Sequence, residues 1–406
     1  MTPVITGLGI TAPTGLGVEA YWTATLAGKS GLGRITRFDP DVYPATLAGE
    51  IHDFDPAEHL PGKLLPQTDL MTQLALAAAD WAFEDAGIVP EQADSLRTGV
   101  VTASSTGGFE FGQRVMQSMW SRGNKHVSAY QSYAWFYAVN SGQISIRNGL
   151  RGACGVVVSD AAGGLDALGQ ARRQLRRDCS AVLAGGVDSS ICSFGLVSQL
   201  ATGRLSTGDD PDRAYLPFDD RAAGHVFGEG GALLVMETPE NALARGAHQV
   251  YGHLAGYAAT MDPRPGSGRE PALRRAVELA LDDAEVSPTE VDVVFADAAG
   301  VPELDAIEAQ VISDVFGAGQ VPVTAPKTAT GRLNAGGGSL DVATALLSIR
   351  DGVVPPTPHV ERSPRYDIEL VTGSPMVARL RTAVVLARGI GGFNSAVVVR
   401  GGLPTR

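Results

Sequence analysis

Short apolar runs alternate along this chain with longer stretches whose apolar residues recur every three or four positions. The short runs are typical of buried strands, and the longer spacing is typical of helices packed on one face. In the first half, strands are predicted at 3–6, 99–103, 156–158, 181–184 and 232–236, and helices at 18–26, 67–87 and 109–120. In the second half, strands are predicted at 249–258, 291–296, 382–387 and 395–400, and helices at 271–286, 303–316 and 338–350. This alternation predicts an α/β layered fold.

The segment 67–87 gives the clearest helix signal. Thr68 or Asp69 can cap its first turn, and Gly87 is expected to end it. A connecting helix is predicted at 237–248, and we place the division of the chain there, into residues 1–240 and 241–406. No convincing repeat relates the two halves by eye, so the sequence alone does not predict a duplication.

The composition excludes several classes of protein. The 406 residues carry a net charge of −12, which argues against nucleic-acid binding because that requires a basic face. No apolar run reaches the roughly 18–20 residues of a membrane helix, and no basic segment typical of a secretory signal precedes the first apolar stretch. Three scattered cysteines show neither a disulfide framework nor metal-ligand spacing. We therefore expect a cytoplasmic protein without a bound metal.

Gly7, Gly9 and Ala12 match the G-x-G-x-x-A pattern of dinucleotide sites. That pattern must open a helix directly, but residues 13–17 have the composition of a turn and the helix comes later, at 18–26. We therefore do not predict a dinucleotide site.

A strand, a tight turn and a helix follow one another between Val156 and Arg177. Several enzyme folds present a nucleophile in such a turn, next to a helix N-terminus that favours negative charge. Here the turn offers Ala161 and Ala162 in place of a reactive side chain. The sequence predicts the backbone of a nucleophile site without the nucleophile.

Five motifs resemble, in the same order, those of the β-ketoacyl synthases of the thiolase fold. They are VITGLG, GGLDA after the central strand, FDD followed by FGEGG, PKT followed by a glycine, and the late GIGGFNS. The resemblance implies a duplicated, five-layered α/β/α/β/α architecture. It also implies a cysteine that holds the acyl group as a thioester and two histidines that assist decarboxylation of a malonyl unit and polarise its carbonyl.

All three catalytic positions implied by the resemblance are replaced in this chain. The cysteine position is Ala161, and the two histidine positions are Asp297 and Arg332. Lys327 and Glu308 are retained, and they resemble a structural ion pair beside the family's site. An alanine methyl group cannot carry a thioester. We hypothesise that Asp297 and Arg332 form an ion pair that fills the site; the alternative is that both drifted toward solvent.

A full scaffold without its catalytic residues resembles the chain length factor, or ketosynthase β subunit, of type II polyketide synthases. The resemblance implies a non-condensing subunit of an acyltransferase complex, paired as a heterodimer with an active ketosynthase α subunit in aromatic, antibiotic-type polyketide biosynthesis. The growing chain would be carried on the phosphopantetheine arm of an acyl carrier protein, with no cofactor bound to this subunit. Many such factors have Gln, linked to malonyl decarboxylation, where this chain has Ala161, so the resemblance does not extend to priming by decarboxylation.

The helix predicted at 109–120 carries the residues expected to set chain length. Phe109, Gly112 and Met116 share one face, which favours a core position, and the resemblance places them in the tunnel shared by the two subunits. Gly112 leaves space and Met116 is flexible. We therefore predict a longer product, of decaketide rather than octaketide type.

Two further groups of side chains allow two interpretations each. The aromatic residues of segment 128–150 fit either a core or a subunit interface, and those singled out are Tyr130, Tyr133 and Phe136. A basic cluster fits a solvated helix face better than a docking site for an acidic carrier protein, and it consists of Arg172, Arg173, Arg176 and Arg177.

Three other functions are alternatives to the chain length factor. A malonyl-carrier decarboxylase that supplies starter units would need polar groups for the enolate, and Asp160, Lys327 and Arg332 are the candidates. A condensing enzyme acting alone is excluded in practice by Ala161. A purely structural homodimer is the third alternative, and expression of the chain alone distinguishes it, because a chain length factor should be poorly soluble or inactive without its partner.

Overall fold

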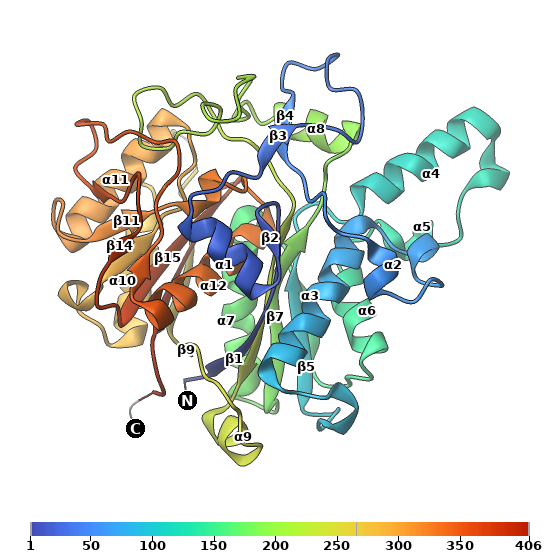
Figure 1. The fold of residues 1–406 in the computed structure, drawn as a ribbon, viewed down its shortest axis with the longest axis horizontal. Helices are drawn as coiled ribbons and strands as arrows, with labels where there is room; N and C mark the ends of the chain where they lie inside the picture. The colour runs from blue at the N-terminus through green and yellow to red at the C-terminus, as the bar shows by residue number, and fades with distance from the viewer. Residues whose placement is uncertain (1, 265, 405–406) are drawn as a thin grey trace.

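The computed structural model describes residues 2–264 and 266–404. Five layers lie side by side in Figure 1. Helices α7 (Gly163–Leu175) and α12 (Ala335–Asp351) occupy the middle layer between two sets of strands, and further helices cover the outer face of each set. This is the five-layered thiolase-like α/β architecture that the resemblance implied.

The elements of the first half agree with most of the predicted segments. The strands are β1 (Val4–Ala12), β2 (Gly15–Leu16), β3 (Leu32–Arg34), β4 (Leu47–Gly49), β5 (Thr98–Ala103), β6 (Cys154–Val157), β7 (Ala181–Asp188) and β8 (Gly230–Glu237). The other helices are α1 (Val18–Leu26), α2 (Pro56–His59), α3 (Leu70–Ala86), α4 (Phe109–Arg122), α5 (Gln131–Ala134), α6 (Val139–Arg147) and α8 (Ser193–Leu200). Short 3-10 turns are η1 (Leu65–Gln67), η2 (Pro90–Gln92), η3 (Asn124–His126) and η4 (Asp160–Ala162).

The second half begins after helix α9 (Pro239–Ala244). Its strands are β9 (Gly252–Met261), β10 (Val293–Phe295), β11 (Pro322–Thr324), β12 (Val353–Val354), β13 (Glu369–Leu370), β14 (Met376–Val377), β15 (Thr382–Gly389) and β16 (Phe393–Arg400). Helices α10 (Leu273–Ala284) and α11 (Pro302–Phe316) lie outside this set, and the 3-10 turns are η5 (Pro288–Glu290) and η6 (Pro326–Thr328). The short strands β11 to β14 were not predicted, because runs of two or three residues are too short to show a period.

The two halves repeat one strand order. The first half runs β6-β5-β7-β8-β1, and the second runs β11-β10-β15-β16-β9. In each half the first two pairings are parallel and the next two are antiparallel. Strands β1 and β9 join the halves through the pairs Val4–His253 and Ile5–Gly252. The chain is therefore a structural duplicate, although no repeat is visible in its sequence.

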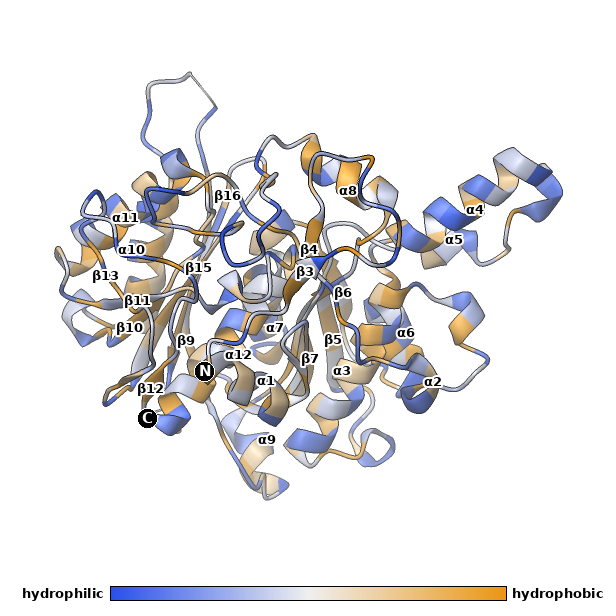
Figure 2. Cartoon of the chain, turned by 45° about the horizontal axis from the view of Figure 1, so that its top comes forward, coloured by the Kyte–Doolittle hydropathy of each residue, from blue (hydrophilic) through white to orange (hydrophobic). Residues whose placement is uncertain are grey.

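Among the described residues, the three largest apolar cores hold the layers together. The central core combines α7 and α12 with both sets of strands, and separate outer cores lie under α3 and under α10 with α11. Figure 2 shows the apolar residues along the strands and on the helix faces turned toward them. At Gly7 and Gly9, a Cβ would lie 2.2 Å from the Ala82 carbonyl oxygen and 1.8 Å from that of Ala78. These glycines let α3 lie directly on β1 and belong to a strand rather than to a dinucleotide turn.

The strand predicted at 156–158 is shifted and less buried than expected. Strand β6 ends at Val157, and its residues are partly or fully exposed. Strand β6 lies at the edge of the sheet, and among the described residues it pairs only with β5, on one side. The prediction of a buried strand was wrong because β-branched residues do not reveal whether a strand lies at an edge.

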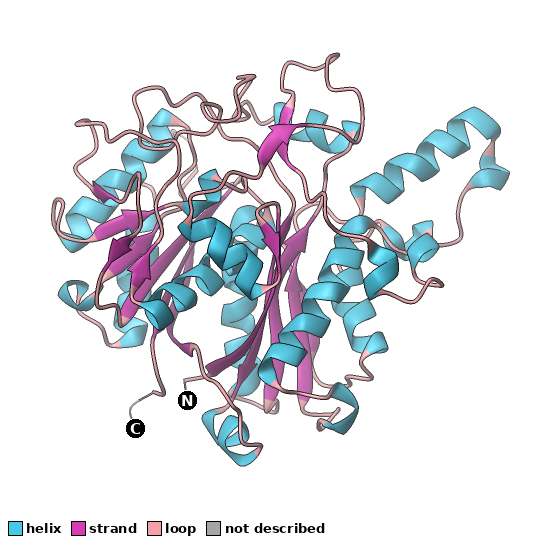
Figure 3. Cartoon of the chain, in the orientation of Figure 1, coloured by secondary structure: helices cyan, strands magenta, loops and turns pink. Residues whose placement is uncertain are grey.

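Helix α4 projects from the body of the molecule, as Figure 3 shows. Two negative results concern only residues 2–264 and 266–404: no helix there is long and apolar enough to cross a membrane, and no cluster of His, Cys, Asp and Glu could hold a metal ion. All three cysteines are free thiols, with Cys154 exposed and Cys179 and Cys192 buried.

Candidate functional site

The predicted nucleophile turn is present and strained. Strand β6 leads into η4, and α7 starts at Gly163. Asp160 has a φ of 51°, a left-handed conformation that costs a non-glycine residue energy and is common at functional sites. The Asp160 carboxylate accepts a hydrogen bond from the Ile390 backbone N–H at 2.7 Å. The chain therefore keeps the turn that would present residue 161, although Ala161 has no reactive group.

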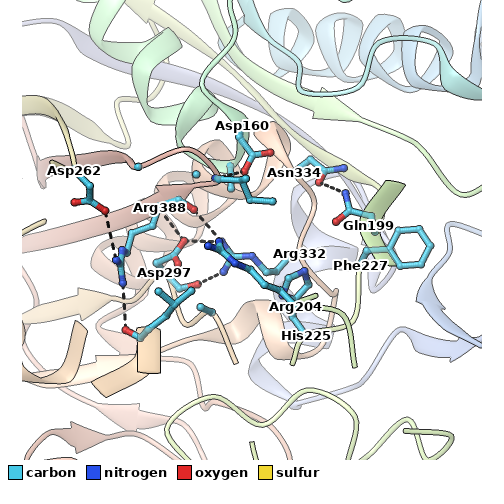
Figure 4. Close-up of a pocket in the computed structure, with 16 residues that line it drawn as sticks. Asp160, Gln199, Arg204, His225, Phe227, Asp262, Asp297, Arg332, Asn334 and Arg388 are labelled. Carbon is cyan, nitrogen blue, oxygen red and sulfur yellow. Dashed lines mark hydrogen bonds and ion pairs between the residues drawn. The ribbon is translucent and has the colours of Figure 1, made fainter. Parts of the chain in front are cut away.

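The three replaced positions meet at one cavity. Ala161 comes from η4, Asp297 follows β10, and Arg332 lies between η6 and α12. All three line a cavity of about 90 Å³, which Figure 4 shows with its charged side chains. The parallel order of β10 and β15 and the central position of α12 bring these distant segments together.

Asp297 and Arg332 form the ion pair that we hypothesised. The Arg332 Nη2 lies 2.8 Å from the Asp297 Oδ1, and the two side chains are 13% and 3% exposed. Arg332 also donates to the backbone oxygen of Asp297 at 2.7 Å, and the Arg388 N–H donates to the Asp297 carboxylate at 2.9 Å. The alternative of drift toward solvent is excluded by this burial.

The electrostatics keep the pair charged. Burial alone would raise the pKa of Asp297, but the positive charges of Arg332 and Lys327 hold it below its usual value. Burial would likewise lower the pKa of Arg332, but Asp297 raises it above its usual value. Both groups therefore stay ionised at neutral pH, and neither is poised to exchange a proton with a substrate.

The retained residues Lys327 and Glu308 do not pair with each other. The Lys327 Nζ lies 2.6 Å from the Asp341 carboxylate of α12. Glu308 of α11 instead accepts hydrogen bonds from the backbone N–H groups of Asp297 at 2.6 Å and Ala298 at 2.9 Å. The prediction of a Lys327–Glu308 ion pair was therefore wrong, because Lys327 of η6 points toward α12 and not toward α11. Burial and the negative charge of Asp297 raise the pKa of Glu308.

His225 is a site residue that sequence reasoning missed. It lines the cavity, and burial together with the charge of Arg332 lowers its pKa to about 3, so the imidazole is neutral. Its Nδ1 has no hydrogen-bond partner among the described residues. Arg388 and Asp262 were also missed and lie 3.9 Å apart at the same cavity. The run GHVFGEGG contains His225, but its spacing gives no sign that the side chain reaches the cavity.

The cavity cannot support the family's condensation. Ala161 offers no sulfur for a thioester, and the side chains at the two positions where the resemblance implies histidines are held in the Asp297–Arg332 pair. The groups considered for an enolate are also occupied: Asp160 by Ile390, Lys327 by Asp341 and Arg332 by Asp297.

The three residues predicted for the tunnel lie on α4. The Phe109 ring packs on Phe194 with centroids 4.8 Å apart, and Met116 is 42% exposed. A Cβ at Gly112 would lie 3.7 Å from the Trp135 Cβ and 3.8 Å from the Gln131 Nε2. A methyl group fits at Gly112, and a larger side chain would press against α5 or extend into the space beside the helix.

The aromatic segment is not core as a whole. Phe136 is 38% exposed, next to Trp135 at 47% and Tyr137 at 38%. Tyr130 and Tyr133 are half-buried with ring centroids 6.0 Å apart, and the Tyr133 hydroxyl donates to the Gln67 amide oxygen at 3.2 Å. This exposure leaves apolar rings available to a partner.

The basic cluster on α7 is partly engaged within the chain. Arg172 is buried and forms an ion pair with Asp283 of α10. The Arg173 guanidinium lies over the Tyr257 ring, 5.8 Å from its centroid. The interpretation of the whole cluster as a solvated face was therefore wrong for Arg172, because α10 packs close enough to cover it.

Comparisons with known proteins cover nearly the whole chain. The family model for the β-ketoacyl synthase N-terminal domain matches residues 2–242, and the model for the C-terminal domain matches 251–361. The tetracenomycin polyketide synthase ketoacyl synthase beta subunit of Streptomyces glaucescens is 59% identical over 399 residues, which cover 98% of each chain.

Two solved structures share the architecture. The ishigamide ketosynthase/chain length factor superposes with a TM-score of 0.90 at 26% identity, covering 99% of both chains. A type II polyketide synthase acyl carrier protein in complex with its ketosynthase bound to the hexaketide gives a TM-score of 0.88 at 26% identity, again covering 99% of both chains.

Proposed function

The chain belongs to the β-ketoacyl synthase family, as a chain length factor (ketosynthase β subunit) of a type II polyketide synthase, and we propose from its site how it acts. It performs no condensation itself. It pairs with an active ketosynthase α subunit, completes the tunnel for the growing poly-β-ketone and limits the length of the product. The single observation that carries this proposal is the intact strained turn with Ala161 in it, beside the buried Asp297–Arg332 pair.

The partner surface is the exposed edge of the first half. Strand β6 has an open side, and an open strand edge readily pairs with another chain. Large apolar side chains are exposed beside it, with Val158 at 49% directly after β6 and Ile146 at 77% on α6, which contacts β6. Trp120 on the projecting helix α4 is 82% exposed. Apolar groups of this size are buried at a stable interface rather than left in water. We assign this face, with Tyr130, Tyr133 and Phe136 at its border, to the ketosynthase α subunit.

The likeness to complexes supports the two partners. One structural neighbour is a ketosynthase with a chain length factor, and the other holds an acyl carrier protein with its ketosynthase. The substrate of this chain's complex is then a polyketide on the phosphopantetheine arm of the carrier protein, and this chain needs no cofactor. We place the complex in the cytoplasm, where free thiols such as those of the three cysteines persist.

The contribution of this subunit is shape. Phe109, Gly112 and Met116 form one wall of the tunnel along α4, and the length available to the polyketide ends where bulky side chains close it. Gly112 leaves a gap beside Trp135 and Met116 is exposed and flexible. This supports a product of decaketide type. We propose that both halves, 1–240 and 241–406, contribute to this role. The first supplies the turn, α4 and the open β6 edge, and the second supplies the Asp297–Arg332 pair.

The malonyl-carrier decarboxylase is the weaker alternative. An enolate would need a free donor or cation, and Asp160, Lys327 and Arg332 each already have a partner. A structural homodimer through β6 is the other alternative.

Co-purification tests the proposal. The chain is expressed with and without a ketosynthase α subunit from the same kind of pathway, and the eluate is assayed with malonyl-carrier protein. We expect an equimolar heterodimer whose product formation is lost when the partner's nucleophilic cysteine is changed to alanine. A stable, homodimeric chain that ignores the ketosynthase, or carbon dioxide release by the chain alone, would overturn it.

A further inference from the structure

One buried carboxylate joins the first turns of two helices. Asp69 is fully buried and caps α3, where its Oδ1 accepts the Met71 N–H at 2.9 Å. Its Oδ2 accepts the Phe111 N–H of α4 at 2.7 Å. Phe111 is in the first turn of α4, so the same side chain satisfies free N–H groups at the start of both helices.

Helix α4 has little else to fix its direction. Among the described residues of this helix, only Phe111 and Gly112 are buried. Its N-cap residue is Gly108, which has no side chain to accept a hydrogen bond from the N–H groups of the first turn. Further links near its start are the Phe109 ring on the Phe194 ring, with centroids 4.8 Å apart, and two hydrogen bonds. The Gly108 N–H donates to the Trp135 oxygen at 3.1 Å, and the Phe194 N–H donates to the Gln113 amide oxygen at 2.7 Å. Beyond this base the helix projects from the body (Figure 1).

The backbone packs tightly at the base of α4, around Gly108. A Cβ at Gly108 would lie 2.1 Å from the Ala134 oxygen and 3.0 Å from the Asp69 Cβ. A side chain at position 108 would clash with this backbone. Glycine at this position therefore lets the first turn of α4 approach Asp69 closely enough for the Phe111 hydrogen bond. The partial positive charges of two helix N-termini converge on this carboxylate, which stabilises its buried negative charge. These two N–H groups oppose the effect of burial, which raises the pKa of Asp69 to about 7.

We propose that Asp69 is a positioning residue for chain length: it sets the direction of α4 and thereby the place of Phe109, Gly112 and Met116 in the tunnel. Asp69 is fully buried and acts through the Phe111 N–H. The inference rests on the proposed function, since it deepens the role assigned to α4.

Two substitutions separate anchoring of α4 from capping of α3. In Asp69→Ser, the short hydroxyl can still accept the Met71 N–H, as serine does at many N-caps, but its single oxygen does not also reach the Phe111 N–H. In Asp69→Asn, the side chain keeps its size, but its single amide oxygen cannot accept from both backbone donors, and its NH₂ group faces the other one. Both variants therefore break the shared cap that joins the two helices, and the serine variant loosens the start of α4 while the cap of α3 is kept.

The test is the product distribution of the complete heterodimer. Each variant is co-expressed with the ketosynthase α subunit, the heterodimer is isolated by size exclusion, and products from malonyl-carrier protein are measured by mass spectrometry. We expect both variants to form the heterodimer. We also expect a mixture of products, most of which differ in chain length from the wild-type product by at least one ketide unit. A general loss of stability would lower the yield without changing the lengths, so the length distribution distinguishes positioning from structure.

Two controls make the outcome decisive. Asp55→Ser replaces an exposed cap in the same way at α2, where Asp55 accepts the Ala57 N–H at 2.8 Å, and should leave the distribution unchanged. Gly112→Phe, in the same assay, tests whether α4 controls length at all. Unchanged lengths in both Asp69 variants with altered lengths in Gly112→Phe would overturn the positioning role alone. If Gly112→Phe also had no effect, the tunnel assignment of the proposed function would fail with it.

Discussion

The Arg332 guanidinium donates to the Asp297 carboxylate at 2.8 Å, at the two positions where the β-ketoacyl synthase resemblance places histidines. The pair is buried beside Ala161 and is held further by the backbone of Arg388. Two charges that satisfy each other therefore fill this part of the cavity, where the resemblance implies groups that transfer protons.

Breaking this pair should destabilise the chain. Asp297→Ala leaves the Arg332 charge buried without its partner, which typically lowers the free energy of unfolding by about 3–5 kcal/mol. Urea unfolding of the heterodimer measures the loss. The matched control is Glu369→Ala, which breaks the exposed pair with Arg362 at 2.6 Å and should cost no more than about 1 kcal/mol. Equal losses in the two variants would show that the buried pair contributes nothing special.

Restoring the nucleophile alone should not restore condensation. Ala161→Cys places a thiol in the strained turn, but Asp297 and Arg332 remain locked together and supply neither histidine function. We expect no polyketide from this variant when the partner's cysteine is changed to alanine, as followed by incorporation of labelled malonyl units. The same variant with the unaltered partner is the positive control. Product from the variant beside an inactive partner would mean that the Asp297–Arg332 pair does not block the chemistry.

A bulky residue at Gly112 should shorten the product. The Trp135 Cβ would lie 3.7 Å from a Cβ at this position, so the ring of Gly112→Phe must extend into the space beside α4 and close the tunnel early. Mass spectrometry of the products measures the shift. Gln117→Phe adds the same ring to an exposed position on another side of α4 and should leave the length unchanged. A Gly112→Phe product of wild-type length would exclude α4 as the tunnel wall.

His225 should make the chain sensitive to acid. Its pKa of about 3 in the folded chain lies below the roughly 6.5 of an unfolded histidine, so the unfolded state binds more protons as pH falls below 6.5. The stability that comes from keeping His225 neutral is present above pH 6.5 and is lost toward pH 3. Relative to the non-titrating variant His225→Asn, the free energy of unfolding of the wild type should fall by about 2 kcal/mol between pH 7.5 and pH 5. Urea unfolding at several pH values checks this, and a difference between the two proteins that is constant with pH would contradict it.

The sequence predicted the layered architecture because local patterns carry it. The cap at Asp69 and the end at Gly87 fixed α3 almost to the residue, and Val18–Leu26 is helical as predicted. The position of a strand within the sheet was harder to predict. The sequence of β6 has the pattern of a buried strand, and only the order of the strands shows that it lies at the edge of the sheet. The duplication is likewise visible only in strand order.

Site residues were predicted where a motif fixes their place and missed where packing does. Ala161, Asp297 and Arg332 follow from motif positions, and the cavity joins them. The Lys327–Glu308 pair was wrong because several buried acids lie near the lysine, and a sequence does not show that Asp341 of α12 is the one it meets. His225 and the double role of Asp69 depend on contacts between segments far apart in the chain, which no local pattern records.

Exchange of the β subunit shows which subunit of the heterodimer sets the length of the product. One ketosynthase α subunit is paired first with this chain and then with the Streptomyces glaucescens tetracenomycin ketoacyl synthase beta subunit, which is 59% identical, carrying a phenylalanine in place of its residue that aligns with Gly112. Products of each purified heterodimer are measured by mass spectrometry with the same carrier protein. We expect product length to follow the β subunit and to be longer with this chain. Product length that follows the ketosynthase, whichever β subunit is present, would contradict it.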